Sequence, residues 1–189
     1  MIEPSRRPGG AADLFAGSVF DVAPRLLGCR LRTAFGRRPV EVMLTEVEAY
    51  AGGDDPASHA FRGRTKRNAA MFEAAGTLYV YRSYGLHWCM NVVVGPPDLP
   101  HAVLLRSGQV TEGTAVVQAR RGRSSHLTDG PGKLAEALGV TGAHDGTSLV
   151  AGPVRLVHGT HPPGARIITT PRIGITKAVD RPWRYILAS

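Results

Sequence analysis

The alternation of hydrophobic and polar positions along the chain predicts many short strands and few helices. Apolar, aromatic and β-branched runs bounded by turn-forming residues are typical of strands, and they occur at residues 29–35, 39–50, 77–82, 87–94, 102–106, 154–157, 167–169, 172–176 and 185–187. Helices are predicted at residues 21–27, 112–123 and 131–138, the first capped by Asp21 and followed by Gly28. Because no strand–helix–strand rhythm is visible, the pattern indicates a mixed α+β domain on an antiparallel sheet.

Length and composition fit one intracellular domain. The chain has 189 residues and 43% hydrophobic residues, which is typical of a single globular domain. Residues 1–10 are polar and carry Pro and Gly, so we expect a flexible tail there. The N-terminus lacks the apolar stretch of a secretory signal, and no run is long enough to span a membrane. We therefore expect a soluble, cytoplasmic protein.

The charge balance favours a polyanionic partner. Lys and Arg number 23 against 15 Asp and Glu, which gives a net charge of +8 and a pI near 10.2. Such an excess is typical of proteins that bind DNA, RNA or an anionic membrane surface. An Arg-biased composition without any partner explains the charge equally well.

Two carboxylates stand where a core strand should be apolar. In strict strand alternation Glu46, Glu48 and Tyr50 share a face with Val42 and Leu44. A carboxylate beside apolar groups suits general acid–base chemistry. An edge strand with a solvated acidic face, or a Glu paired to an Arg, explains the pattern as well, and for this segment alone we favour that interpretation.

Aromatic residues mark the predicted hairpin over residues 77–94. Tyr79 and Tyr81 share a strand face, and Tyr84 lies at the tip beside Gly85. Exposed aromatic side chains near basic groups can stack on bases or wedge between base steps. Alternatively, Tyr84 folds back onto the sheet.

The remaining candidates are less specific. His59 stands alone in a long loop over residues 51–68, where a structural role is commoner than a catalytic one. Three histidines and one cysteine could be combined on paper into a zinc site (His59, His87, Cys89 and His101), but no metal-binding motif such as HExxH or CxxC occurs. We therefore expect no metal. The turn before Lys133 resembles a phosphate-binding turn at a helix start, although a plain turn is the simpler interpretation.

Taken in order, these residues resemble the alkyladenine (3-methyladenine) DNA glycosylase family, as a bacterial member. The matching segments are EVEAY (46–50), His59, GRTKRN (63–68), MF (71–72), GTLYVY (76–81), YG (84–85), CMN (89–91), VLLR (103–106), GPGKL (130–134) and RIGI (172–175). One short motif would be weakly specific, but this ordered series is highly specific and covers roughly residues 20–187.

The resemblance implies an activity and a fold. Such enzymes hydrolyse the N-glycosidic bond of alkylated or deaminated purines, flip the nucleotide out of double-stranded DNA, and leave an abasic site. We therefore expect a single DNA glycosylase domain over residues 1–189. Its fold is expected to be α+β, with a curved, mainly antiparallel β-sheet, flanking helices and a protruding β-hairpin.

The resemblance also assigns roles to individual residues. Glu48 corresponds to the catalytic general base that activates water. The base-binding pocket corresponds to four residues: Tyr50, His59, Tyr81 and Asn91. Asn91 guards the pocket against an exocyclic amino group, and the backbone N–H of residue 59 reads the purine edge. The DNA-binding set comprises the intercalating Tyr84 with Arg106, Arg64 and Lys133.

We further expect a monofunctional enzyme that needs no cofactor. A lyase step needs an amine nucleophile for a Schiff base, and none of the three lysines (Lys66, Lys133 and Lys177) lies in such a motif. No long amphipathic seam for a dimer is visible, so we expect a monomer. In a bacterial cell the protein would be cytoplasmic and associated with the nucleoid through DNA.

Two other functions remain open from the sequence. A non-catalytic nucleic-acid-binding module could use the tyrosines as a stacking platform, although Glu48 would then repel phosphates to no purpose. A sugar hydrolase could use Glu46 and Glu48 as its acid–base pair, although the basic residues argue against an uncharged substrate.

Overall fold

A computed structural model describes residues 11–36 and 38–188, so the tail predicted for residues 1–10 lies outside the described residues. The strands are β1 (Arg30–Thr33), β2 (Val40–Ala51), β3 (Leu78–Ser83), β4 (His87–Val94), β5 (His101–Glu112), β6 (Val154–Val157), β7 (Arg166–Thr170) and β8 (Arg184–Ala188). The α-helices are α1 (Val19–Arg25), α2 (Thr114–Arg121) and α3 (Pro131–Leu138). Short 3-10 helices occur at Ala11–Phe15, Gly52–Asp54, Ala69–Phe72 and Gly142–His144.

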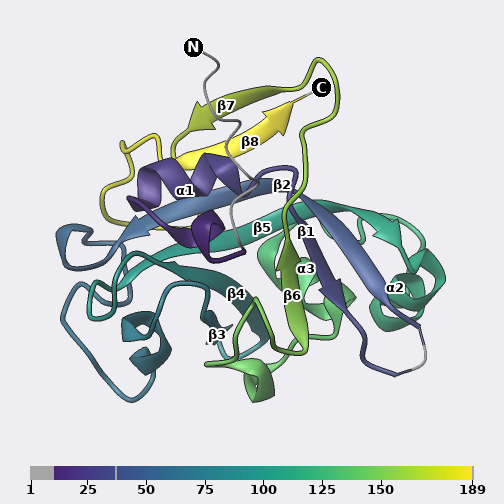
Figure 1. Cartoon of the computed structure of the whole chain (residues 1–189), viewed down its shortest axis with the longest axis horizontal. Coiled ribbons are helices and arrows are strands. Elements are labelled where there is room, and N and C mark those ends of the chain that lie inside the picture. The colour runs from purple at the N-terminus through teal and green to yellow at the C-terminus, as the bar shows by residue number, and fades with distance from the viewer. Residues whose placement is uncertain (1–10, 37, 189) are drawn as a thin grey trace, which may run out of the picture.

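The strands form one antiparallel sheet that divides along β2 (Figure 1). Its main path runs β3-β4-β5-β2-β1-β6. β2 pairs with β5 along most of its length, while its other edge pairs with β1 over residues 40–43 and with β8 over residues 46–48. β7 then pairs with β8. The curled antiparallel sheet with its helices confirms the predicted α+β class.

An irregularity in β2 coincides with this division. Leu44 pairs with Gly108 and Glu46 with Ser107, so Thr45 is an extra residue without a partner in β5. Such a bulge reverses which residues face the core. Gly108 permits it, because a Cβ at that position would lie 2.6 Å from the Met43 carbonyl oxygen.

The bulge overturns one prediction about β2. Val42 and Leu44 before it and Val47 and Ala49 after it all belong to the main core cluster. The acidic positions after the bulge therefore lie on the opposite face from Val42 and Leu44. Strict alternation gave the wrong face because it assumed a regular strand.

The helices cover the sheet with small and aliphatic residues. α1 packs against β2 and β5, α3 packs against β4 and β5, and α2 packs against α3. Leu134 and Leu138 of α3 and Val22 of α1 are completely buried in the same cluster. The predicted cap of α1 is wrong by three residues: the Ser18 hydroxyl oxygen accepts the N–H of Asp21, which lies within the first turn.

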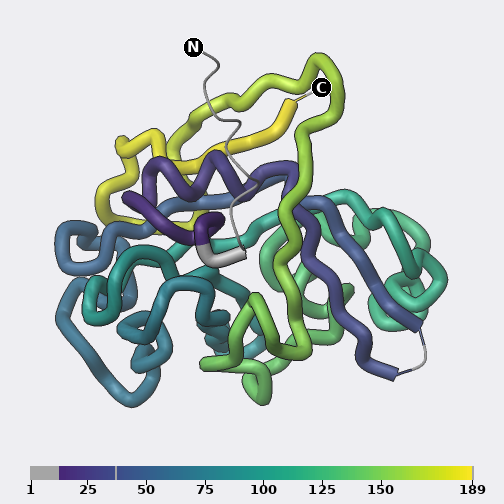
Figure 2. The backbone as a smooth tube through the Cα atoms, viewed as in Figure 1, coloured from purple at the N-terminus to yellow at the C-terminus, as the bar shows by residue number. Residues whose placement is uncertain are grey.

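Other element boundaries also differ from the sequence prediction. β5 extends to Glu112 and α2 begins only at Thr114, so the predicted helix over residues 112–123 starts too early. The strand predicted over residues 172–176 does not exist; the segment has no regular structure. The irregular stretch after β2 is present and winds along one side of the molecule (Figure 2).

Candidate active site

The half of β2 after the bulge places Glu48 beneath the main surface cavity. This cavity has a volume of about 620 Å³, and its lining includes Tyr50, Arg106 and Ile173. Glu48 itself is 0% exposed, because these three residues cover it. A water molecule can therefore reach the carboxylate only if one of its covering residues shifts.

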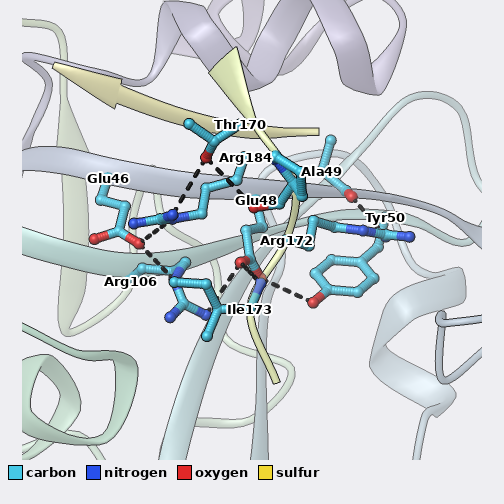
Figure 3. A network of polar contacts seen from close by, with 10 residues as sticks. Glu46, Glu48, Ala49, Tyr50, Arg106, Thr170, Arg172, Ile173 and Arg184 are labelled. Atoms are coloured by element: carbon cyan, nitrogen blue, oxygen red, sulfur yellow. Dashed lines mark hydrogen bonds and ion pairs between the residues drawn. The ribbon is translucent and has the colours of Figure 1, made fainter. Parts of the chain in front are cut away.

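Three donors converge on the Glu48 carboxylate (Figure 3). The Tyr50 hydroxyl donates to Oε2 at 2.9 Å, and the Ile173 backbone N–H donates to Oε1 at 2.8 Å. Arg106 Nη1 lies 3.2 Å from Oε1. A buried polar group needs such partners, and together they hold the carboxylate in one orientation.

Glu46 has a different environment two residues earlier. Its Oε1 accepts hydrogen bonds from Arg106 Nε and Arg184 Nε, each at 2.7 Å. Arg184 also donates to the Thr170 hydroxyl at 3.2 Å. Two guanidinium groups therefore neutralise Glu46, and Glu46 fixes the position of Arg106 beside Glu48 (Figure 3). The sequence pattern left open that a glutamate on this strand pairs with an arginine, and Glu46 does so.

Aromatic side chains form the adjoining pocket. Tyr79 and Tyr81 stack with centroids 5.6 Å apart, which confirms that they share a face. The His59 ring meets Tyr81 edge-on at 4.4 Å, and its Nδ1 lies 3.0 Å from the Tyr79 hydroxyl. Beneath them is a smaller cavity of about 20 Å³, lined in part by Tyr50 and Asn91. The structure thus brings all four predicted pocket residues together.

This pocket is electrically neutral near pH 7. Burial raises the pKa of Tyr79 to about 12 and raises the pKa of Tyr50 and of Tyr81 further still. Burial, with a smaller effect of the positive charge on Arg67, lowers the pKa of His59 below its usual value. A flat, neutral and polarisable surface of this kind is suited to stacking on a planar ligand.

Asn68 shapes the loop that carries His59. Its Nδ2 donates to the carbonyl oxygens of His59 and Gly63, each at 3.0 Å, and its Oδ1 accepts the N–H of Thr65 at 2.6 Å. Within residues 11–36 and 38–188 the backbone N–H of His59 donates no hydrogen bond. That N–H is therefore available to a ligand.

The β3–β4 hairpin projects Tyr84 at its tip. Tyr84 and Gly85 both have positive φ, 50° and 69°, as a tight hairpin turn requires. Tyr84 is 88% exposed and borders the main cavity, so it does not fold back onto the sheet. Leu86 beside it is 71% exposed, a second apolar side chain at the tip that the sequence pattern did not single out.

The predicted DNA-binding cations lie in different surroundings. Arg106 is only 12% exposed and lines the cavity. Arg64 lies outside the cavity lining and pairs with Glu73 at 2.9 Å. Lys133 pairs with Asp129 at 3.1 Å. Two other cations, Arg67 and Lys177, do line the cavity and were not among the predicted site residues.

Neither a metal centre nor a membrane-spanning helix is found in the described part of the chain. No group of three or more His, Cys, Asp or Glu side chains there is arranged to hold a metal ion. No helix in residues 11–36 and 38–188 is both long and apolar enough to cross a membrane.

Comparisons with known proteins identify the family. A family model described as methylpurine-DNA glycosylase (MPG) matches residues 13–189. Proteins named "Putative 3-methyladenine DNA glycosylase" are similar over nearly the whole chain. The one from Frankia casuarinae is 48% identical and the match covers 93% of this chain and 87% of the relative. The one from the archaeon Methanoculleus marisnigri is 47% identical, with 93% of each chain covered.

A third relative with the same name, from Streptomyces avermitilis, is 44% identical over 98% of this chain and 90% of its own length. These matches confirm the resemblance that the ordered motifs indicated. The chain belongs to the methylpurine-DNA glycosylase family of DNA repair proteins.

Proposed function

We propose that this protein is a monofunctional DNA glycosylase that releases alkylated or deaminated purines from double-stranded DNA by hydrolysis. The single observation that carries the proposal is the buried carboxylate of Glu48 beneath a cavity lined in part by aromatic side chains. Family membership supports the same chemistry. No metal or cofactor is required for the reaction as proposed.

Glu48 acts in this proposal as the general base. Cleavage of an N-glycosidic bond builds positive charge on the sugar, which a fixed carboxylate stabilises while it orients a water molecule. The three donors hold the Glu48 carboxylate in one orientation beneath the cavity. Binding of DNA then displaces part of the cover and admits the water.

The main cavity receives the flipped base against its aromatic side chains. An alkylated purine carries positive charge and stacks favourably between Tyr81 and Tyr50 with His59 at the edge. The free N–H of His59 is placed to donate to the purine, and Asn91 borders the inner cavity, where it would meet an exocyclic amino group. Neutral groups in the pocket also accept uncharged deaminated purines.

The exposed hairpin and the basic surface engage the duplex. Tyr84 fills the gap that the flipped nucleotide leaves in the base stack. The net charge of +8 supplies phosphate contacts that carry no sequence preference, as a search for scattered lesions requires. In this proposal the protein acts on DNA as a monomer, with Arg106, Arg64 and Lys133 near the strand backbone.

The test is base release from a panel of duplexes that each contain one lesion, measured in single turnover with EDTA present. The panel comprises 3-methyladenine, 7-methylguanine, hypoxanthine and ethenoadenine, with an undamaged duplex as the control. Strand breaks should appear only after alkali, since a monofunctional enzyme leaves the abasic strand intact. Tight binding to lesion DNA without release of any base would instead support a stacking module.

A further inference from the structure

One wall of the main cavity has no backbone support of its own. Ile173, Gly174, Ile175, Thr176 and Lys177 all line this cavity. Within the described chain, residues 171–177 belong to no strand or helix and take part in no backbone–backbone hydrogen bond. Something other than a β-ladder must therefore hold Ile173 against Glu48.

A buried ion pair supplies the attachment. Arg172 and Asp55 both have side chains that are 0% exposed. Arg172 Nη1 and Nη2 donate to the two carboxylate oxygens of Asp55 at 2.5 and 2.8 Å. Nη1 also donates to the carbonyl oxygen of Ala49 in β2 at 3.0 Å. The two-pronged geometry fixes the direction of the guanidinium as well as its position.

Aromatic rings enclose the same guanidinium. Its central carbon lies 4.5 Å from the ring centroid of Tyr50 and 4.9 Å from that of Trp183. Tyr50 is the residue whose hydroxyl donates to Glu48. Arg172 is therefore connected to Glu48 by two routes, through the ring of Tyr50 and through the backbone N–H of the next residue, Ile173 (Figure 3).

The other end of the pair organises a second loop-built wall of the same cavity. The Asp55 carboxylate accepts the N–H of Ala57 at 3.1 Å, and the Asp55 carbonyl oxygen accepts the N–H of Ser58 at 2.8 Å. These bonds form the turn that leads to His59. Pro56, Ala57 and His59 line the cavity, so a single ion pair joins the loop that carries His59 to the segment that covers Glu48.

We propose that the Asp55–Arg172 pair is a brace between the two loop-built walls, and that Asp55 and Arg172 are positioning residues for Glu48, Tyr50 and His59. Its effect on base excision rests on the function proposed above. The brace fixes the geometry of the site and adds little to the free energy of unfolding, because a buried ion pair stabilises a protein little more than a well-packed apolar pair does. Arg172 Nε, buried and without a hydrogen-bond partner in the described chain, adds a further cost.

Two single variants break the brace with small changes in side-chain size. Arg172→Lys keeps the positive charge but loses the planar two-pronged contact and the stacking. Asp55→Asn keeps the acceptor for Ala57 but loses the negative charge. For each we expect a fall of ~10²-fold in the single-turnover excision rate, the effect of a misplacement of about 1 Å. The Kd for lesion DNA should change far less.

A double variant separates geometry from stability. The double variant Asp55→Asn with Arg172→Met removes both charges at once and leaves no unpaired buried charge. Its unfolding midpoint should therefore return toward that of the unmodified protein. Excision should nevertheless stay low, because the walls are no longer joined. A folded double variant that excises bases at nearly the unmodified rate would overturn the proposal.

A matched control comes from a second ion pair outside the site. Arg121 of α2 contacts Glu136 of α3, and neither residue lines the main cavity. Arg121→Lys and Glu136→Gln should alter the unfolding midpoint without a change in the excision rate. Loss of excision in these controls equal to that in the brace variants would mean that general destabilisation, not positioning, explains the result.

Hydrogen exchange tests the brace in the unmodified protein and without catalysis. The test therefore works even if no variant folds or no base is released. Hydrogen exchange of the Ile173 amide, followed by NMR, should be as slow in the unmodified protein as that of core amides in β2 and β5. In Arg172→Lys it should accelerate while those core amides do not. Fast exchange of Ile173 in the unmodified protein would overturn the brace, whereas slow exchange in a protein that releases no base would refute only the proposed function.

Discussion

The two sides of the main cavity are built in different ways. On one side, Tyr50 of β2 and Arg106 of β5 sit on hydrogen-bonded antiparallel strands, in which Glu48 pairs with Leu104. On the other side are the two loop-built walls, residues 56–59 and 173–177, which side chains hold in place. We call the strand-built side the ladder wall and the two loop-built walls together the loop wall.

The difference separates two requirements of the proposed reaction. A carboxylate that must act on one water molecule needs a rigid support, and backbone hydrogen bonds on both edges of β2 provide it. The surface that receives the base is built from loops, whose shape depends on a few side-chain contacts and not on a backbone ladder. Substitutions confined to one wall can therefore separate the two requirements.

The largest effect is expected from the carboxylate on the ladder wall. Glu48→Gln keeps the size of the side chain but removes proton acceptance and the negative charge, so single-turnover excision should fall by at least ~10²-fold. Lesion DNA should still bind, because the change removes an anion near the phosphates.

The natural control for Glu48 is Glu46, two residues away on the same strand. Because its carboxylate is already bound by Arg106 and Arg184, Glu46→Gln should cost less in rate. A dead Glu46 variant beside an active Glu48 variant would move the general base to Glu46.

A substitution at Gly108, opposite the bulge, tests what fixes the shape of the ladder wall. In Gly108→Ala the new methyl group would clash with the Val42 side chain and with the Met43 carbonyl oxygen. We expect a loss of about 2–3 kcal/mol in the free energy of unfolding, as for overpacked sites, measured by urea denaturation. Gly53→Ala is the control, since a Cβ there meets nothing within 4 Å. Equal midpoints for the two variants would show that the bulge does not depend on Gly108.

A substitution of Asn68 tests what holds the loop wall in place. Asn68→Ala leaves the carbonyl oxygens of His59 and Gly63 without their donor, which should cost about 1–2 kcal/mol of stability. Binding of lesion DNA should weaken as well, because His59 is no longer fixed. Thr33→Ala removes a comparable buried side-chain bond, to the Leu138 carbonyl oxygen, and should lower stability alone. Unchanged lesion binding in Asn68→Ala would show that the loop wall keeps its shape by other means.

The smallest effect concerns acid stability. Since burial and Arg67 lower the pKa of His59 in the folded protein, the unfolded chain takes up its proton first. The free energy of unfolding should therefore fall as the pH drops below about 6.5, the ordinary histidine pKa. His59→Gln should reduce this loss. His101 at the start of β5 has a pKa lowered by burial but opposed by Asp54, so His101→Gln should change the pH dependence less.

Local patterns in the sequence predicted most of the elements and selected residues that the structure brings together around the cavity. The aromatic runs of β3 and β4 and the Tyr84–Gly85 turn predict the hairpin because strand propensity and turn chemistry are local properties. The ordered motifs also indicate the family, since they fix residue types at defined spacings. The same motifs predict roles for Glu48 and the pocket residues, because residue type and spacing belong to the chain itself.

Tertiary structure alone decided how those residues face one another. The bulge at Thr45 depends on the close approach of Gly108 from β5, more than sixty positions away. Likewise, residues 172–176 look like a strand, but the sheet offers them no partner, and a buried ion pair with Asp55 holds them instead. Propensity describes one segment at a time, whereas bulges and buried ion pairs arise between segments distant in the sequence, where packing and the pairing of buried charge decide.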